Sequence, residues 1–269
     1  MSRHPAFHRT ELLLGSAAQD ALATARVIIF GIGGVGSWCA EALVRSGVGH
    51  LTIVDNDVVC ITNVNRQLQA TSKNVGQSKV EALKERLLSI VPGADVQAIE
   101  TVYTQTTRDS FDIQSYNYVI DAIDSLSHKV DLIATAMELN VTLYSAMGAA
   151  CKLDASAIQV DSIWNSKGCK LAAFVRKRLR RYGVTGDCTC IYSEEFLPSG
   201  KATAACGSDK CFCPKKLDEN GNEISSDIWC HTKAQINGSL AHITGAYGFH
   251  LAGLIIQDIY KKNPPPLAE

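Results

Sequence analysis

The chain has 269 residues, of which 46% are hydrophobic and 20% are charged. This length supports one large domain, or a nucleotide-binding core with an appendage, and the composition excludes disordered and collagen-like proteins. Twenty-six Lys and Arg residues against 27 Asp and Glu residues give a net charge of −1, which excludes a uniformly basic coat for nucleic acid. Residues 1–24 contain no apolar signal-peptide core, so the ten cysteines are expected to be reduced thiols of a cytoplasmic protein.

Short apolar runs alternate with helical spacing in the first two thirds of the chain. Strands are predicted over residues 26–30, 50–54, 95–99, 118–120 and 141–146. Helices are predicted over residues 34–45, 78–90 and 126–139, with Ser78 as an N-cap. This alternation predicts a doubly wound, mostly parallel α/β sheet of the Rossmann-like type, with residues 1–150 as a nucleotide-binding core.

The pattern changes in residues 151–269, which are predicted to form an irregular, substrate-binding extension. A strand is expected over 157–160, a basic helix over 171–181 and an extended segment over 188–192, followed by a cysteine-rich loop over 199–227. Residues 238–260 are apolar and long enough to span a bilayer. Their internal His242, Gln257 and Asp258 favour a buried closing helix or a subunit contact, so no transmembrane span is expected.

A glycine-rich loop follows the first strand and opens a helix, as in dinucleotide-binding proteins. Its glycines are Gly31, Gly33, Gly34 and Gly36. They allow a tight turn and a close approach of phosphate to backbone amides. Asp55 ends the second strand, where a carboxylate can accept hydrogen bonds from ribose hydroxyls. These features predict a nucleotide site but are shared by NAD enzymes.

Cations that follow the ribose-binding acid favour a triphosphate over a nicotinamide. Arg66 and Lys79 can neutralise charge that develops at the α-phosphorus of ATP. Asp124 follows the fourth strand at the edge where open α/β sheets bind ligands, and a carboxylate there suits magnesium bound to phosphates. The alternative role of Asp124 is the N-cap of the helix that follows.

Several motifs occur in order between Arg9 and Met147, namely GIGGVGS, VDNDVV, NVNRQ, GQSK and DAIDS. Together they resemble the adenylation domain of the ubiquitin-activating-enzyme-like superfamily. The resemblance implies that a substrate carboxylate attacks the α-phosphate of ATP, giving an acyl-adenylate and pyrophosphate. It implies an ATP site made of Asp55, Asp57, Asn65, Arg66, Gln67, Lys79, Asp124 and Ser125, with magnesium on Asp124. It also implies a homodimer, in which Arg9 reaches the phosphates bound by the partner subunit.

Three longer stretches, SWCAEALVRSGVG, YVIDAIDSLSHKV and KLAAFVRKRLRRYGV, are similar to the tRNA threonylcarbamoyladenosine dehydratases within that superfamily. Such enzymes activate the threonyl carboxylate of a modified adenosine beside the tRNA anticodon. The carbamoyl group then closes on the activated carbonyl and expels AMP, so the net change is the ATP-dependent loss of water. The alternatives are adenylation of the C-terminus of a ubiquitin-like sulfur-carrier protein, or a nucleotide-binding scaffold without chemistry.

A cluster of cations without an acid lies between Lys167 and Tyr182, in and just before the predicted basic helix. Its proposed tRNA-binding members are Lys170, Arg176, Lys177, Arg178, Arg180 and Arg181. On a nearly neutral protein this concentration favours a local phosphate-binding surface. A solvated helix face and a docking site for an acidic protein are the alternatives.

The cysteines permit more than one role. Cys206, Cys211, Cys213 and Cys230 can supply four zinc ligands, although their spacing departs from common zinc motifs and a loop of unliganded thiols is the alternative. Cys188 or Cys190 can act as a nucleophile only with a lowered pKa, and the cyclisation itself needs no protein thiol. A monovalent cation near the site and a sulfur-transfer partner of the cysteine-desulfurase type are further open expectations.

Overall fold

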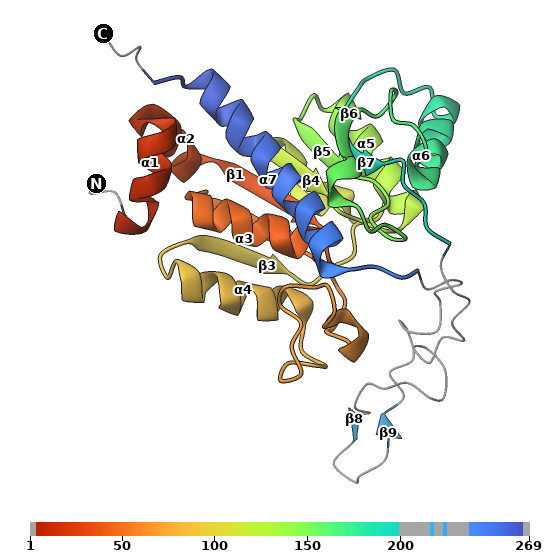
Figure 1. The fold of residues 1–269 in the computed structure, drawn as a ribbon, viewed down its shortest axis with the longest axis horizontal. Coiled ribbons are helices and arrows are strands. Elements are labelled where there is room, and N and C mark those ends of the chain that lie inside the picture. The colour runs from red at the N-terminus through yellow and green to blue at the C-terminus, as the bar shows by residue number, and fades with distance from the viewer. Residues whose placement is uncertain (1–3, 199–215, 218–222, 225–236, 266–269) are drawn as a thin grey trace.

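A computed structural model describes residues 4–198, 216–217, 223–224 and 237–265. Its main sheet has the strand order β3-β2-β1-β4-β5-β7-β6 (Figure 1). The strands are β1 (Arg26–Phe30), β2 (His50–Val54), β3 (Asp95–Ile99), β4 (Tyr118–Asp121), β5 (Leu143–Ala146), β6 (Ile158–Ser162) and β7 (Thr189–Ser193). Only β6 runs antiparallel to its neighbour within this sheet, so the predicted doubly wound, mostly parallel fold is confirmed. A separate antiparallel pair joins β8 (Lys216–Leu217) to β9 (Glu223–Ile224).

Helices connect the strands as the sequence predicts, with shifts of a few residues at their ends. The α-helices are α1 (His8–Leu14), α2 (Ser16–Thr24), α3 (Gly36–Ser46), α4 (Lys79–Ile90), α5 (Leu126–Glu138), α6 (Lys170–Arg181) and α7 (Ala241–Lys262). The 3-10 helices are Pro5–Phe7, Ile61–Asn63, Arg108–Phe111, Ile113–Ser115 and Ala155–Ala157. The sequence did not predict α1 and α2. Ser78 does occupy the N-cap position of α4, but its hydroxyl makes no capping hydrogen bond.

Alternating side chains of the central strands build a core on each face of the sheet. Val27 and Ile29 of β1 point to the face covered by α2, α3, α4 and α7. Ile28 and Phe30 point to the opposite face, which α5 and α6 cover. Both faces of β1 are therefore buried, which explains why its sequence is a continuous apolar run.

The closing helix α7 packs along α3 (Figure 1). A Cβ atom on Gly248 would lie 2.6 Å from the backbone oxygen of Val35, so only glycine permits this close contact of the two helix backbones. Ile243, Tyr247 and Leu251 of α7 are fully buried in the core. The predicted buried closing helix is therefore confirmed, and no helix in the described ranges is both long and apolar enough to cross a membrane.

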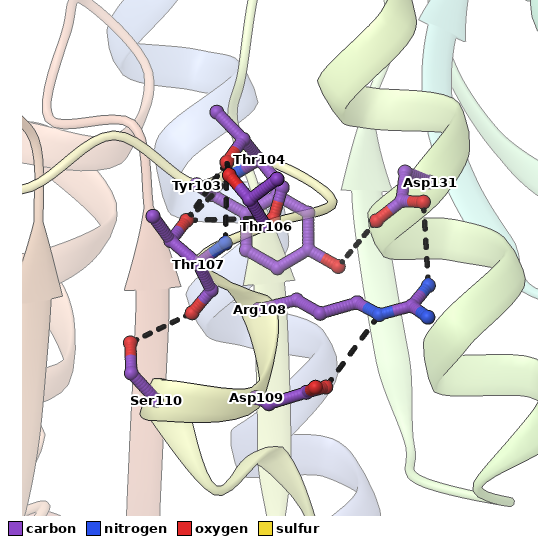
Figure 2. A network of polar contacts seen from close by, with 8 residues as sticks. All are labelled: Tyr103, Thr104, Thr106, Thr107, Arg108, Asp109, Ser110 and Asp131. Carbon is purple, nitrogen blue, oxygen red and sulfur yellow. Dashed lines mark hydrogen bonds and ion pairs between the residues drawn. The ribbon is translucent and has the colours of Figure 1, made fainter.

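A polar network fixes the second turn of α5 to the segment that follows β3 (Figure 2). The Tyr103 hydroxyl donates to Oδ2 of Asp131 over 3.0 Å, and Nη1 of Arg108 lies 3.5 Å from Oδ1 of the same carboxylate. Burial raises the pKa of the Tyr103 hydroxyl, which therefore stays protonated as a donor. The Tyr103 ring packs edge-on against Phe30 at the end of β1. This network holds α5 in place beside the end of β1.

The strand order reverses between β1 and β4, because β2 lies on one side of β1 and β4 lies on the other. The helices that follow these two strands, α3 and α5, cover opposite faces of the sheet, which is the arrangement that gives doubly wound folds a ligand-binding crevice at the carboxyl edge. Gly31–Gly36 follows β1, and the loop from Ala122 to Ser125 follows β4. The fold therefore brings the glycine loop and Asp124 to the switch point, where doubly wound proteins bind their ligands.

Candidate adenylation site

The glycine loop makes a turn that excludes side chains at two positions. Gly31 has a φ of +91°, and a Cβ atom there would lie 2.6 Å from the backbone oxygen of Ala122. A Cβ atom on Gly36 would lie 2.0 Å from the backbone oxygen of Gly31. The loop thus turns directly against the segment after β4 and opens α3 with the backbone exposed toward the crevice. Gly33 and Gly34 complete the turn, and the predicted tight loop is confirmed.

Asp55 is fixed by backbone amides on both sides of its carboxylate. Its Oδ2 accepts from the amide of Ile32 over 2.7 Å, and its Oδ1 accepts from the amide of Asp57 over 2.9 Å. Burial raises the pKa of Asp55, and the nearby Lys79 ammonium opposes that rise. Each carboxylate oxygen keeps a further lone pair, so Asp55 can accept hydrogen bonds from two ribose hydroxyls without moving.

Lys79 is a buried cation held by two acids. Its Nζ lies 2.6 Å from Oδ2 of Asp57 and 4.0 Å from Oδ1 of Asp55. The Lys79 side chain is only 6% exposed, although it opens α4. An isolated buried ammonium is costly, so the acidic pair stabilises it beside the ribose-binding position. An incoming phosphate can then share or replace Asp57 as its counter-ion.

The segment from Asn63 to Gln69 forms the side of the crevice next to α3. Nη1 of Arg66 donates to the backbone oxygen of Thr62 over 2.9 Å and to Oδ1 of Asn65 over 3.0 Å. The backbone oxygen of Arg66 accepts from Nε1 of Trp38 over 3.1 Å. Asn65 and Arg66 are therefore held together, and the backbone of Arg66 is fixed to the first turn of α3.

Two glutamines of this segment lie under the glycine loop. Gln69 donates through Nε2 to the backbone oxygen of Ile32 over 2.9 Å, which fixes the loop from below. Gln67 is 7% exposed, and its buried Oε1 has no hydrogen-bond partner among the residues that the structure describes. A buried polar oxygen without a partner is costly, and a bound hydroxyl or amine would satisfy it. The Oε1 atom of Gln69 likewise has no partner within the described part of the chain, so the missing partner does not by itself distinguish Gln67 as a ligand-binding residue.

The closing helix contributes to the same region from the far end of the chain. Nδ2 of Asn65 donates to the backbone oxygen of Ser239 over 2.8 Å. The hydroxyl of Thr244 lies 3.4 Å from the backbone oxygen of Arg66. The segment that carries Asn65 and Arg66 is thus held between α3 and α7. Sequence reasoning missed this role of Thr244 because nothing in the local pattern links it to residue 66.

A buried ion pair lies beneath the loop that carries Asp124. Nζ of Lys129 lies 2.5 Å from Oδ2 of Asp121, and both side chains are 0% exposed. The same ammonium donates to the backbone oxygen of Ala146 over 2.9 Å, and the hydroxyl of Ser145 also donates to Asp121. Oδ1 of Asp121 accepts from the amide of Ile123 over 3.1 Å. The pair therefore connects the ends of β4 and β5 to α5 and fixes the turn before Asp124.

Asp124 itself is exposed at the carboxyl edge of the sheet. The N-cap position of α5 belongs to Ser125, whose side chain makes no capping hydrogen bond, so Asp124 lies one residue before the N-cap. An exposed carboxylate at this edge fits magnesium, which usually takes one or two carboxylates together with substrate phosphates. The described residues contain no cluster of three or more acidic, His or Cys side chains suited to a metal.

The remaining predicted residues lie on the helices α1 and α6 or outside the described residues. Arg9 is exposed on α1, next to Leu12 and Leu13, which are 73% and 77% exposed. The basic residues lie on α6, which covers the same face of the sheet as α5. The proposed zinc ligands Cys206, Cys211, Cys213 and Cys230 lie outside the described residues.

Cys188 and Cys190 lack the environment of a nucleophile. Both are buried, at 7% and 0% exposed. Burial raises the pKa of the Cys188 thiol, and it raises that of Cys190 from 9.0 to about 12. The thiolate is the reactive form, so these cysteines are inert at neutral pH. Neither thiol therefore has the lowered pKa that a nucleophilic role requires.

Comparison with known proteins agrees with this arrangement. The ThiF family matches residues 7–265. The tRNA threonylcarbamoyladenosine dehydratase of Bacillus subtilis (strain 168) is 41% identical over 189 residues, which cover 70% of this chain and 74% of that protein. Its counterpart in Escherichia coli (strain K12) is 37% identical over 221 residues, covering 79% and 82%. Crystal structures of the E. coli enzyme with AMP and with ATP superpose with TM-scores of 0.79 and 0.78 at 31% identity, covering 95% of this chain and 94% of theirs.

Proposed function

Because this chain belongs to the ThiF family, whose profile matches residues 7–265, we propose that it is an ATP-dependent tRNA threonylcarbamoyladenosine dehydratase. The proposal rests on the 41% identity to the B. subtilis dehydratase and on a crevice with the parts that adenylation needs. The observation that carries the chemistry is the buried Lys79 ammonium, which lies 4.0 Å from the Asp55 carboxylate at the switch point of the sheet. This pair places a cation for phosphate beside an acceptor for ribose.

The reaction begins when the threonyl carboxylate of the modified adenosine attacks the α-phosphorus of ATP. A new bond forms between the carboxylate oxygen and phosphorus, and the bond to the pyrophosphate oxygen breaks. Lys79 and Arg66 supply positive charge to the phosphate oxygens, which gain negative charge as the bond to pyrophosphate breaks. The carbamoyl group of the substrate then attacks the acyl carbon and expels AMP, with loss of one proton from the nucleophile. The two reacting groups belong to one molecule, which favours ring closure.

The ligands of the nucleotide are assigned by position. Asp55 binds the ribose, and the amides of the glycine loop, Asn65, Arg66 and Lys79 bind the phosphates. Asp57, Gln67 and Ser125 complete the lining. Asp124 is the residue that would hold magnesium, which neutralises phosphate charge when it is bound.

Arg9 is assigned to the second subunit of a homodimer. It is exposed on α1, and two neighbouring leucines on that helix are also exposed, which favours a subunit contact at this surface. A zinc site in the cysteine-rich loop, a monovalent cation near the nucleotide and a sulfur-transfer partner remain predictions. The division of the chain into a nucleotide-binding core over residues 1–150 and a substrate-binding extension over residues 151–269 also remains a prediction.

The test is turnover of tRNA by the purified protein. The protein is incubated with ATP, magnesium and tRNA that carries threonylcarbamoyladenosine, and the digested nucleosides are analysed by mass spectrometry. We expect a product lighter by one water, with AMP and pyrophosphate in equal amounts. Lys79→Met should lower kcat by about 10²–10³-fold because one charge that stabilises the transition state is lost. Lys73→Met, at an exposed turn before α4, is the matched control and should retain wild-type activity.

Two outcomes would contradict the proposal, and each would support a different function. Pyrophosphate exchange that requires a ubiquitin-like carrier, without any cyclic nucleoside, would assign the chain to sulfur-carrier adenylation. If Lys79→Met and Arg66→Ala leave every activity of the protein unchanged, the chain is instead a nucleotide-binding scaffold without chemistry.

A further inference from the structure

The outward face of α6 carries three cations around one exposed aromatic ring. Phe174 is 55% exposed, while the opposite face of the helix buries Ala172, Val175 and Leu179. Residues three, four and seven positions apart lie on one face of a helix. Lys170, Lys177 and Arg181 stand at these positions relative to Phe174, and all are exposed. The ring is thus the apolar centre of a cationic surface.

A second exposed ring extends this surface beyond the helix. Phe196 follows β7 and is 54% exposed, and Nζ of Lys170 lies 3.9 Å from the centroid of its ring. Lys170 therefore lies beside both aromatic residues, since Phe174 is one helical turn further along α6. Two half-exposed phenylalanines on one small surface are unusual for a residue type that is mostly buried, and they indicate contact with a ligand or partner.

The cations of α6 fall into two groups with different surroundings. Arg176 donates to the Ser166 hydroxyl, Arg178 donates to Ser127 over 3.0 Å, and Arg180 lies over the Trp164 ring at 5.4 Å. These three arginines have partners within the protein. Among the residues that the structure describes, Lys177 and Arg181 form no ion pair or side-chain hydrogen bond. They remain available to an anionic ligand, beside the ring of Phe174.

The start of this surface lies at the carboxyl edge of the sheet, where the nucleotide crevice is. Gly148 follows β5 at that edge, and a Cβ atom on it would lie 3.8 Å from Cβ of Leu171, the neighbour of Lys170. Farther along α6, the hydrogen bond from Arg178 reaches Ser127, which belongs to the first turn of α5, three residues after Asp124. A ligand bound along α6 can therefore extend to the loop that carries Asp124.

We propose that the surface formed by Lys170, Phe174, Lys177, Arg181 and Phe196 binds the single-stranded anticodon loop of the tRNA substrate. Lys177 and Arg181 contact backbone phosphates, and the rings of Phe174 and Phe196 stack on unpaired bases. Cations with interleaved exposed aromatic side chains match the chemistry of a single strand, because its bases offer free faces that a duplex hides. This inference rests on the proposed function, since it takes the modified adenosine to lie in such a loop.

The test measures equilibrium binding of an RNA stem-loop with the anticodon sequence, at fixed salt and without ATP. Phe174→Ala and Phe196→Ala should each weaken binding by about tenfold, because stacking of one base is lost. Phe174→Trp should restore it. The matched control is Tyr260→Ala near the end of α7, far from α6 (Figure 1), which should bind as the wild type does. Both phenylalanines are more than half exposed, so thermal unfolding should show that the variants fold normally.

A fully paired RNA duplex with the same number of phosphates separates stacking from charge. Binding of this duplex should not respond to Phe174→Ala, whereas Lys177→Gln together with Arg181→Gln should weaken binding of both RNAs and flatten their salt dependence. Stem-loop binding that is unchanged in both alanine variants would overturn the proposal. Preference of the wild type for polyglutamate over the stem-loop would assign this surface to an acidic protein instead.

Failure of this inference is distinct from failure of the proposed function. The binding assay needs no ATP and no turnover, so it reports on the surface alone. If the protein cyclises the nucleoside but its stem-loop binding does not depend on Phe174 and Phe196, the proposed function stands and the proposed RNA-binding surface is refuted. If the protein binds the stem-loop through these rings but never forms a cyclic product, the surface stands and the proposed function is refuted.

Discussion

Removal of the Lys129 ammonium should destabilise the protein more than removal of the whole Asp121–Lys129 pair. Both side chains are 0% exposed, so Lys129→Met leaves the Asp121 carboxylate as an unpaired buried charge. Breaking a buried pair in this way costs about 3–5 kcal/mol. At about 2–4 °C per kcal/mol for a protein somewhat smaller than this one, Tm should fall by about 10 °C.

The double variant Asp121→Leu with Lys129→Met removes both charges. Its remaining losses are the hydrogen bonds of the Ser145 hydroxyl, the Ala146 carbonyl and the Ile123 amide, about 1 kcal/mol each, so its total cost should be about 3 kcal/mol, at the low end of the range for the single variant. Urea unfolding followed by circular dichroism measures both values. The reasoning is refuted if the single variant costs no more than the double variant, because the buried charge would then have found another partner.

The same pair of variants separates stability from positioning. The amide of Ile123 donates to Asp121 in the wild type, and leucine removes that acceptor. The turn before Asp124 then loses its anchor, so the double variant should be more stable than Lys129→Met but should regain little turnover. Asp121→Asn with Lys129→Met keeps an oxygen for Ile123 and should turn over faster than the leucine version. Equal rates for the two double variants would show that the turn needs no such anchor.

Three further experiments test the roles assigned to Asp124, Arg9 and Cys190. Asp124→Ala should abolish turnover at every magnesium concentration while ATP still binds, as measured by calorimetry; a wild-type rate would remove Asp124 from the mechanism. Arg9→Ala and Lys79→Met should each be inactive. If Arg9 acts across a two-fold dimer, mixing the two variants should restore about a quarter of wild-type activity, because half of the dimers then contain one intact site out of two. No recovery after subunit exchange would place Arg9 elsewhere. Cys190→Ala should stay active. Folding raises the Cys190 pKa from 9.0 to about 12, so the unfolded state loses its proton first and the free energy of unfolding should fall as pH rises above about 9; the slope should be smaller in the alanine variant, and an identical slope would contradict the assignment.

The central strands could be predicted closely because their sequences leave few alternatives. β1 and β2 have the bounds expected from apolar runs that end in glycine or in a polar residue, and the edge strand β3 also has the predicted bounds. Helix ends were less certain, since capping depends on contacts that one sequence does not reveal. α1 and α2 were missed because α2 is rich in alanine, and its burial comes from contacts with the core rather than from a strong apolar stripe.

Much of the site could also be predicted, since parallel strands bring their carboxyl ends to one edge. This places Asp55 and Lys79 together although they lie 24 positions apart in the sequence. The Asp121–Lys129 pair was missed because a lysine in a helix is normally assumed to face solvent. One signal was present: Lys129 precedes Val130 within an apolar helix, and Asp121 ends an apolar strand. Charges of opposite sign inside two apolar elements indicate a buried pair.

The contacts between α7 and the segment around Asn65 and Arg66 have a consequence for biosynthesis. Ser239 and Thr244, which hold that segment from the closing helix, are translated long after the glycine loop and Asp55. A nascent chain on the ribosome can therefore form strands of its sheet while the segment of Asn65 and Arg66 still lacks these contacts. That segment is fully held only when translation has passed these late residues, so the proposed nucleotide site would be completed last.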